Sequence, residues 1–210
     1  MKKIIFASNN PHKLAEVRRI FNKYKVLSLK EIGFDKEIEE DGLTFEENAL
    51  IKARTVMDYV KSHLKFTYGV LADDSGLCVK AIGYEPGIMS ARYSGGGDAE
   101  NRKKLLDKLI SISDRTAYFV CSIALVLPDG NEMTSEGKTY GLITKEEIGD
   151  TSFGYDPIFW SNDIRKTFGQ ATPEEKDKVS HRGKALINIK EYLEEINYFD
   201  ISNGEEEEDY

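Results

Sequence analysis

Cysteine, proline and histidine are scarce in this sequence, whose 210 residues include 2 Cys, 5 Pro and 3 His. So little proline excludes a collagen-like or linker-dominated chain. The two cysteines, Cys78 and Cys121, have the spacing neither of a disulfide framework nor of a zinc site. We therefore expect both cysteines to be small core residues.

Long hydrophobic runs are also absent. The mean hydropathy is −0.46, and no apolar run approaches the roughly 20 residues that a membrane-spanning helix needs. The apolar stretch at residues 4–7 is too short for a signal peptide. We therefore expect a soluble, cytoplasmic protein with no membrane partner.

The net charge of −8 is unevenly distributed. Six of the 37 acidic residues lie at or after Asp200, where there is no Lys or Arg, so the rest of the chain is close to neutral. Such a chain lacks the basic face that nucleic-acid binding needs, and no nucleic-acid partner is expected. Residues 197–210 are predicted to form an acidic, disordered tail.

Hydrophobic periodicity and turn residues predict a mixture of strands and helices. A capping box, in which a Thr and the Glu three residues later bond to the first helical N–H groups, begins one helix at Thr44 and another at Thr172. Pro11 begins a helix near the N-terminus, and Ser180 would cap the last one. This order of elements predicts an α/β fold with one sheet flanked by helices. The predicted strands are residues 3–7, 25–29, 70–72, 77–81, 117–127 and 153–160.

The turn between the first strand and the first helix is a candidate phosphate site. Such turns present free backbone N–H groups and the positive end of a helix. Asn10 can donate through its amide, and Lys13 supplies a positive charge. The glycines of a Walker loop are missing, so the spacing alone favours an ordinary capped turn, in which His12 would be a surface residue. The segment comprises Ser8, Asn9, Asn10, Pro11, His12 and Lys13.

Two adjacent carboxylates, Asp73 and Asp74, follow an apolar strand. Carboxylates placed at a strand end suit a hard divalent cation or the activation of water. Neighbours in a strand point to opposite faces, so we expect only one of the two to face a given site. A solvated turn is the alternative, since Asp and Gly are common turn residues.

An acidic run at residues 37–41 precedes the helix that begins at Thr44. Acids at this place complement the helix dipole, which is the simpler explanation, but Glu39 or Glu40 could also supply a second carboxylate for Mg²⁺. Lys52 lies on the same helix, four residues after Asn48. By itself Lys52 is typical of an exposed helical lysine.

Two later segments are candidates for recognition of a planar ring. The first interrupts an aromatic stretch with Gly and Pro, and its rings could stack on a ligand or could line an edge strand. The second gathers cationic donors at a helix start, which suits an anion or a carbonyl-rich base, although its lysines could equally form a solvated face. These candidates are Phe153, Gly154, Tyr155, Asp156, Lys176, His181 and Arg182.

The order of these motifs along the chain resembles the inosine/xanthosine triphosphate pyrophosphatase family. The resemblance covers about residues 3–196. It rests on SNNPHK (8–13), GLTFEENA (42–49), ADDSGL (72–77), PGIMSARYSG (86–95), FGYDPIF (153–159) and SHRG (180–183).

The resemblance implies a two-lobed catalytic domain over residues 1–196, an elongated mixed sheet with a cleft between the lobes, and a homodimer. Residues 8–13 and Lys52 would hold the triphosphate of a purine nucleotide, and Ser75 would contact the nucleotide. Asp74 matches the catalytic carboxylate and, with Glu39 or the adjacent Glu40, would bind Mg²⁺. The segment 153–156, Lys176, His181 and Arg182 would form the base pocket.

The resemblance further implies hydrolysis of ITP, dITP and XTP to the nucleoside monophosphate and pyrophosphate, which would cleanse the nucleotide pool. Asp74 would accept a proton from the attacking water, and His181 and Arg182 would donate to the 6-oxo group of the base. Two other functions are weighed against this one: a Maf-like pyrophosphatase acting on other nucleotides, and a nucleotide sensor without turnover. A purely structural protein would leave the polar clusters unexplained.

Overall fold

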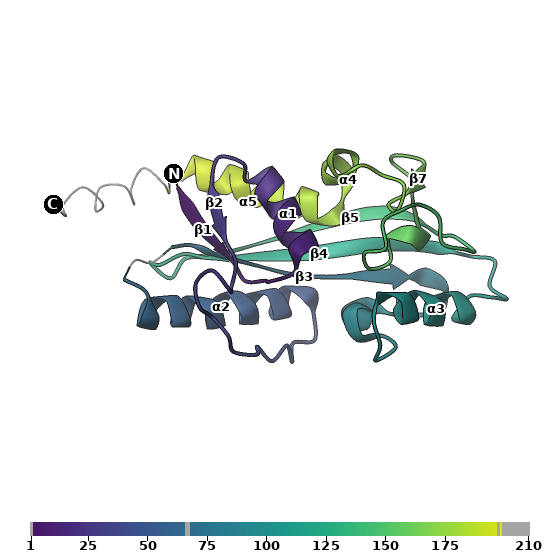
Figure 1. Cartoon of the computed structure of the whole chain (residues 1–210), viewed down its shortest axis with the longest axis horizontal. Helices are drawn as coiled ribbons and strands as arrows, with labels where there is room; N and C mark the ends of the chain where they lie inside the picture. Colours follow the sequence, from purple (N-terminus) through teal and green to yellow (C-terminus); the bar gives the residue numbers. More distant parts are fainter. Residues whose placement is uncertain (1, 66–67, 197, 199–210) are drawn as a thin grey trace.

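A seven-stranded mixed sheet organises the chain, and its strand order is β2-β1-β3-β4-β5-β6-β7 (Figure 1). The computed structural model describes residues 2–65, 68–196 and 198. β1 pairs in parallel with β2 and β3, and every other pairing is antiparallel. The predicted α/β fold is confirmed. The strands are β1 (Lys3–Phe6), β2 (Lys25–Leu27), β3 (Val70–Val79), β4 (Thr116–Val126), β5 (Glu132–Ile143), β6 (Phe159–Ser161) and β7 (Lys166–Thr167).

Helices cover both sides of this sheet. In Figure 1, α1, α4 and α5 lie above the sheet, and α2 and α3 lie below it. Apolar residues of α1 and α5 form one core with β1, β3 and β4, and those of α2 form a second core with the opposite side chains of the same strands. A third, aromatic cluster joins α3 to the far end of the sheet. The helices are α1 (Pro11–Ile20), α2 (Phe45–His63), α3 (Asp98–Lys108), α4 (Pro173–Val179) and α5 (His181–Glu195), with 3-10 turns η1 (Lys80–Ile82), η2 (Gly87–Arg92) and η3 (Asp156–Ile158).

The predicted helix starts are confirmed in detail. Both capping boxes form, at Thr44 before α2 and at Thr172 before α4. Ser180 ends α4 and caps α5, whose Gly183 N–H donates to the Ser180 hydroxyl over 2.9 Å. The chain therefore turns sharply between two helices, so that His181 and Arg182 occupy the first turn of α5.

Two sequence predictions about strands are wrong. β3 does not end at Ala72: all ten of its residues, with Asp73 and Asp74 in the middle, pair with β4. Cationic and amide side chains from the helices satisfy both carboxylates, so no turn is needed to solvate them. The aromatic stretch 153–160 is a turn and a 3-10 helix for most of its length, since Gly154 adopts a positive φ of 54° and Pro157 cannot donate to a strand ladder.

The expectations about the cysteines, a membrane-spanning helix and the acidic tail have different outcomes. Cys78 and Cys121 are free and buried, as predicted. No helix among residues 2–65 and 68–196 has the length and apolar character needed to cross a membrane. The predicted acidic tail lies, apart from Tyr198, outside the described residues.

Candidate active site

The two adjacent carboxylates of β3 face opposite sides of the sheet, as the alternation of strand side chains predicts. Asp73 lies on the side of α1 and α5, where its Oδ2 is 3.0 Å from Lys13 Nζ and 3.1 Å from Arg182 Nε. Asp74 lies on the side of α2, where its Oδ2 accepts from Asn48 Nδ2 over 3.1 Å. The strand therefore presents one carboxylate to each of two separate clusters.

Electrostatics distinguish the two carboxylates. Burial by itself would raise the pKa of Asp73, but the nearby charges of Lys13 and Arg182 outweigh it and hold that pKa well below its ordinary range. Burial raises the pKa of Asp74, and the opposing effects of Lys52 and the Asn48 amide do not cancel it. Asp73 is thus a fixed negative charge, whereas Asp74 is the more basic group and the better proton acceptor.

A second acidic residue lies near Asp74. By itself Lys52 is typical of an exposed helical lysine, but in the structure it is buried. Its Nζ is 3.2 Å from Glu40 Oε2 and 3.7 Å from Asp74 Oδ1. The Glu39 side chain is exposed. Of the two neighbouring glutamates, Glu40 is therefore the one that the structure joins to Asp74 through Lys52.

This donor set fits Mg²⁺. Proteins commonly hold Mg²⁺ with only one or two carboxylates, the remaining ligands being waters and substrate phosphates. Glu40 and Asp74 supply two oxygen donors beside the same ammonium group. Within the described part of the chain, no three acidic, His or Cys side chains form a metal-binding group, so a complete protein cage is not provided.

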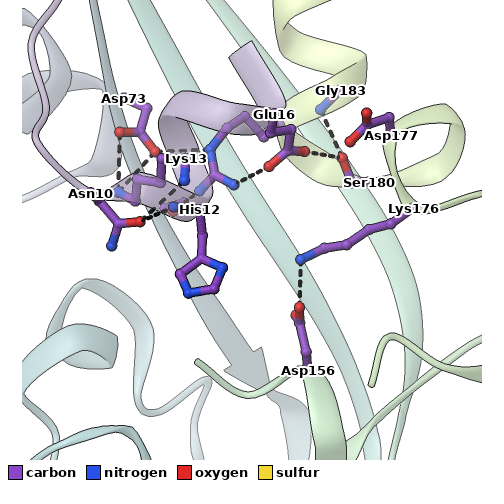
Figure 2. Close-up of polar contacts among 12 residues, drawn as sticks. Asn10, His12, Lys13, Glu16, Asp73, Asp156, Lys176, Asp177, Ser180 and Gly183 are labelled. Atoms are coloured by element: carbon purple, nitrogen blue, oxygen red, sulfur yellow. Dashed lines mark hydrogen bonds and ion pairs between the residues drawn. The ribbon is translucent and has the colours of Figure 1, made fainter. Parts of the chain in front are cut away.

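Arg182 joins three elements of the fold from a fully buried position. Its Nη1 donates to Glu16 Oε2 over 2.6 Å, its Nε donates to Asp73, and its Nη2 donates to Ser75 Oγ over 3.0 Å. Figure 2 shows Glu16 beside Ser180, whose hydroxyl donates to Glu16 Oε1 over 2.7 Å. Three of the five N–H groups of Arg182 thus donate to other protein groups. Arg182 therefore links α1, β3 and α5, a structural role that the sequence did not predict.

Glu16 is an internal carboxylate that sequence analysis missed. Burial opposes its ionisation, but Arg182, Lys176 and His181, together with the Ser180 hydroxyl, lower the pKa of Glu16 to about 2. One signal was available, because Glu16 lies one helical turn after Lys13 and between the buried Leu14 and Val17. Asn48 was missed in the same way, although it lies one turn before Lys52.

The predicted phosphate turn is a well-formed helix start. Asn10 Oδ1 accepts from the backbone N–H groups of His12 and Lys13 over 3.0 and 3.1 Å, Pro11 occupies the first helical position, and Ser8 Oγ accepts from the Asn10 N–H. Asn9 Oδ1 accepts from the Lys30 N–H. The capped-turn interpretation is confirmed. Because the turn also brings Lys13 to Asp73, a positive charge lies at this helix start.

A cavity of about 150 Å³ joins these elements. A cavity of about this size holds one small planar molecule such as benzene, so it is too small to enclose a whole nucleotide. Of the described residues predicted for the site, Ser8, Asn9, Pro11, His12, Glu39, Lys52 and Asp74 are not part of its lining. A larger groove of about 780 Å³ lies between α3 and residues 110–115, away from the carboxylates and without any predicted site residue. The predicted residues that line the cavity are Asn10, Lys13, Ser75, Phe153, Gly154, Tyr155, Asp156, Lys176, His181 and Arg182.

The cavity combines rings with a buried ion pair. Lys176 Nζ is 2.5 Å from Asp156 Oδ2 and 5.4 Å from the centre of the Phe153 ring. Burial raises the pKa of Asp156, against the opposing charge of Lys176. Tyr155 donates its hydroxyl to the Ser90 carbonyl over 2.8 Å, so it braces the wall. Lys176 and Asp156 therefore form a polar part of the cavity wall, with which a bound ring could interact.

His181 lies on the cavity wall, stacked on Phe119 at 4.7 Å between ring centres and 10° between planes. Burial and the neighbouring Arg182 lower its pKa well below 6.5. Its imidazole is therefore neutral at pH 7, with one ring nitrogen a donor and the other an acceptor. The buried Nδ1 has no hydrogen-bond partner among the described residues.

Two residues of α3 hold the Phe153 loop and were also missed from the sequence. Arg102 is buried, and its Nη1 donates to the carbonyls of Ser152 and Gly154 over 2.9 and 2.8 Å. Asp98 Oδ2 accepts from the Gly154 N–H over 2.7 Å. These bonds fix the backbone on either side of Phe153. Sequence periodicity gave no signal for them, because they join segments about 50 residues apart.

Comparison with known proteins places these features in context. Residues 4–192 match the Ham1 family. The chain is similar to the dITP/XTP pyrophosphatase of Clostridium perfringens, with 45% identity over 93% of this chain and 99% of that protein. It is also similar to the dITP/XTP pyrophosphatase of Bacillus subtilis, with 44% identity over 92% of this chain and 98% of that protein. The solved Ham1 protein of Staphylococcus aureus superposes with a TM-score of 0.80 at 42% identity, covering 92% of this chain and 98% of that one.

Proposed function

The chain belongs to the Ham1 family, and we propose that it hydrolyses the non-standard purine nucleotides ITP, dITP and XTP to the nucleoside monophosphate and pyrophosphate. The observation that carries this proposal is the 42–45% identity, over about nine-tenths of the chain, to relatives named dITP/XTP pyrophosphatase. Because the chain is close to neutral apart from its acidic C-terminal residues, binding of a triphosphate needs local cations, and Lys13 and Lys52 supply one on each side of β3.

The reaction is proposed to depend on Mg²⁺, which Glu40 and Asp74 would hold. When bound, the ion would neutralise phosphate charge and lower the pKa of a water molecule. Asp74 accepts the proton of the water that attacks the α-phosphorus, and pyrophosphate leaves. Lys52 and Lys13 hold the phosphate oxygens as point charges, and Asp73 keeps Lys13 in place.

Base selectivity is assigned to the cavity. Phe153 provides a ring for stacking, and Arg182 and the N–H of the neutral His181, which both line the cavity, can donate hydrogen bonds to the 6-oxo group of hypoxanthine or xanthine. Adenine has an amine at that position, which would leave the guanidinium donor unpaired in a buried place. Arg182 also links α5 to β3 through Asp73 and Ser75.

The test is pyrophosphate release from ITP, dITP, XTP and ATP by the purified full-length chain, with and without Mg²⁺. The proposal expects turnover of the first three, little turnover of ATP and none in EDTA. Equal hydrolysis of ATP would refute the base selectivity. Preference for a modified pyrimidine would favour a Maf-like enzyme, and tight ITP binding without product would favour a sensor.

Residues 1–196 are proposed to act as one catalytic domain, as a homodimer in the cytoplasm. Support for the dimer comes from apolar side chains exposed on the surface, because exposed apolar surface commonly marks an interface. Tyr140 and Leu142, which share one face of β5, are 56% and 44% exposed, and Tyr84 and Met89 are also exposed. Light scattering of the purified protein measures the oligomeric state, and a monomer at all concentrations would contradict the dimer.

A further inference from the structure

His12 and Phe153 form an aromatic stack between two distant parts of the chain. His12 lies in the first turn of α1, and Phe153 lies in the loop before η3. Their ring centres are 4.5 Å apart and their planes differ by 20°. Figure 2 shows the His12 ring extending from α1, away from the Lys13–Asp73 pair. A residue of the predicted phosphate turn thus contacts Phe153, which is part of the cavity wall.

The stack covers one face of the Phe153 ring. Phe153 lines the cavity, whereas His12 is not among the described residues that do so. His12 therefore backs the ring from outside the cavity, and the rest of the ring surface remains for a bound base. Offset stacking of this kind contributes beyond the area that it buries.

The backbone of Phe153 is held in place, so its conformational freedom is confined to rotation of the side chain. Asp98 and Arg102 hold the backbone of residues 152–154 with three hydrogen bonds. A phenyl ring on a fixed backbone can still rotate among rotamers. The Phe153 ring stacks closely on His12, whereas Lys176 Nζ lies farther away, 5.4 Å from the ring centre. The stack on His12 therefore opposes rotation of the Phe153 ring.

We propose that His12 is a positioning residue for base recognition: it holds the Phe153 ring ready to stack on the purine, and it does not act on the phosphates. This inference rests on the proposed function and extends it to a residue of the SNNPHK turn. A side chain ordered before binding lowers the entropy cost of binding. Loss of the stack should therefore weaken binding of the nucleotide and leave the chemical step unchanged.

The test compares KM and kcat for ITP in His12→Ala, His12→Phe and His12→Lys. The alanine and lysine variants should raise KM roughly three- to tenfold with kcat within about twofold of wild type, and phenylalanine should restore KM, because it keeps the ring. If the charge or ring nitrogens of His12 served phosphate, lysine would restore KM and phenylalanine would not. That result, or an unchanged KM in His12→Ala, overturns the proposal.

Two controls separate positioning from other effects. Inorganic tripolyphosphate, a competitive inhibitor without a base, should inhibit wild type and His12→Ala equally, and weaker inhibition of the variant would contradict the proposal. His63→Ala removes another stacked histidine, 4.3 Å from Tyr59 near the end of α2, and should leave KM unchanged.

A wild-type chain without turnover of ITP would refute the proposed function alone. The inference would then be tested by calorimetric measurement of ITP binding to the same variants. Weaker binding by His12→Ala, together with wild-type binding by His12→Phe, would support it, and any other result would contradict it.

Discussion

Asp73 and Asp74 are consecutive residues of β3, yet each carboxylate pairs with a different lysine on a different side of the sheet. Lys13 from α1 approaches Asp73, and Lys52 from α2 approaches Asp74. The alternation of side chains along β3 therefore places Asp73 in a buried ionic network and Asp74 at the proposed Mg²⁺ site. Matched substitutions can separate these roles.

Asp74→Asn should abolish most of the activity while preserving the fold. Loss of a proton acceptor typically lowers kcat by about 10²–10⁴-fold, and the amide can still accept from Asn48. Asp73→Asn should instead destabilise the protein by about 3 kcal/mol, because it leaves Arg182 and Lys13 with one counter-charge fewer. Steady-state kinetics and urea unfolding of both variants provide the comparison. Equal stability losses would contradict the division of roles.

Glu39 and Glu40 form a second matched pair. Glu40→Gln should raise the Mg²⁺ concentration for half-maximal activity by roughly tenfold or more, since the charge of the ligands sets cation affinity. Glu39→Gln should have little effect, because Glu39 is exposed and Glu40 is the residue paired with Lys52. Activity is measured against Mg²⁺ concentration after treatment with EDTA. A larger effect of Glu39→Gln would transfer the proposed ligand role to that residue.

Glu16 predicts a pH dependence of stability. Its pKa of about 2 in the folded state lies below the ordinary 4.5, so its ionised form stabilises the fold above about pH 4.5, and this contribution is lost as the pH falls toward 2. The shift corresponds to about 3 kcal/mol. Urea unfolding of wild type and Glu16→Gln between pH 7 and pH 3 should give two curves that converge on acidification. Parallel curves would show that Glu16 does not titrate in this way.

Arg102 should stabilise both the fold and the base cavity. Arg102→Met keeps the aliphatic stem but leaves the Ser152 and Gly154 carbonyls without their donor, which should cost about 2 kcal/mol and raise KM. Arg54→Met is the control, because Arg54 forms a surface ion pair with Glu132 and should contribute less than about 1 kcal/mol. Thermal unfolding and KM for ITP are the measurements. Similar losses in both variants would contradict a special role for Arg102.

The sequence predicted most elements because their signals are local. Capping at Thr44, Thr172 and Ser180 depends on residues within one helical turn, and all three caps form. The strand predicted at residues 117–127 is confirmed as β4. The strand conformation of residues 73–76 was not predicted, because Asp and Gly have low strand propensity. Only contacts with residues distant in the sequence compensate for that low propensity.

The site was predicted unevenly for the same reason. Motif order identified most of the cavity lining, including Phe153, Asp156 and Lys176. The buried partners Glu16, Asn48 and Arg102 act through contacts distant in the sequence, which no local pattern encodes. Arg182 was predicted as a base donor and lines the cavity, but its three hydrogen bonds to Glu16, Asp73 and Ser75 were not predicted. The ligand roles of Glu40 and Asp74 remain predictions.

The placement of both carboxylates within β3 also has a dynamic consequence. A residue inside a ten-residue strand that is fully paired with β4 cannot swing aside, so the spacing of Asp73 and Asp74 stays constant whether or not a nucleotide is present. If the proposed nucleotide enters and leaves through movement of the backbone, that movement falls to a segment without a strand partner, such as residues 35–42. Amide exchange should accordingly be slow at the two aspartates and faster in residues 35–42.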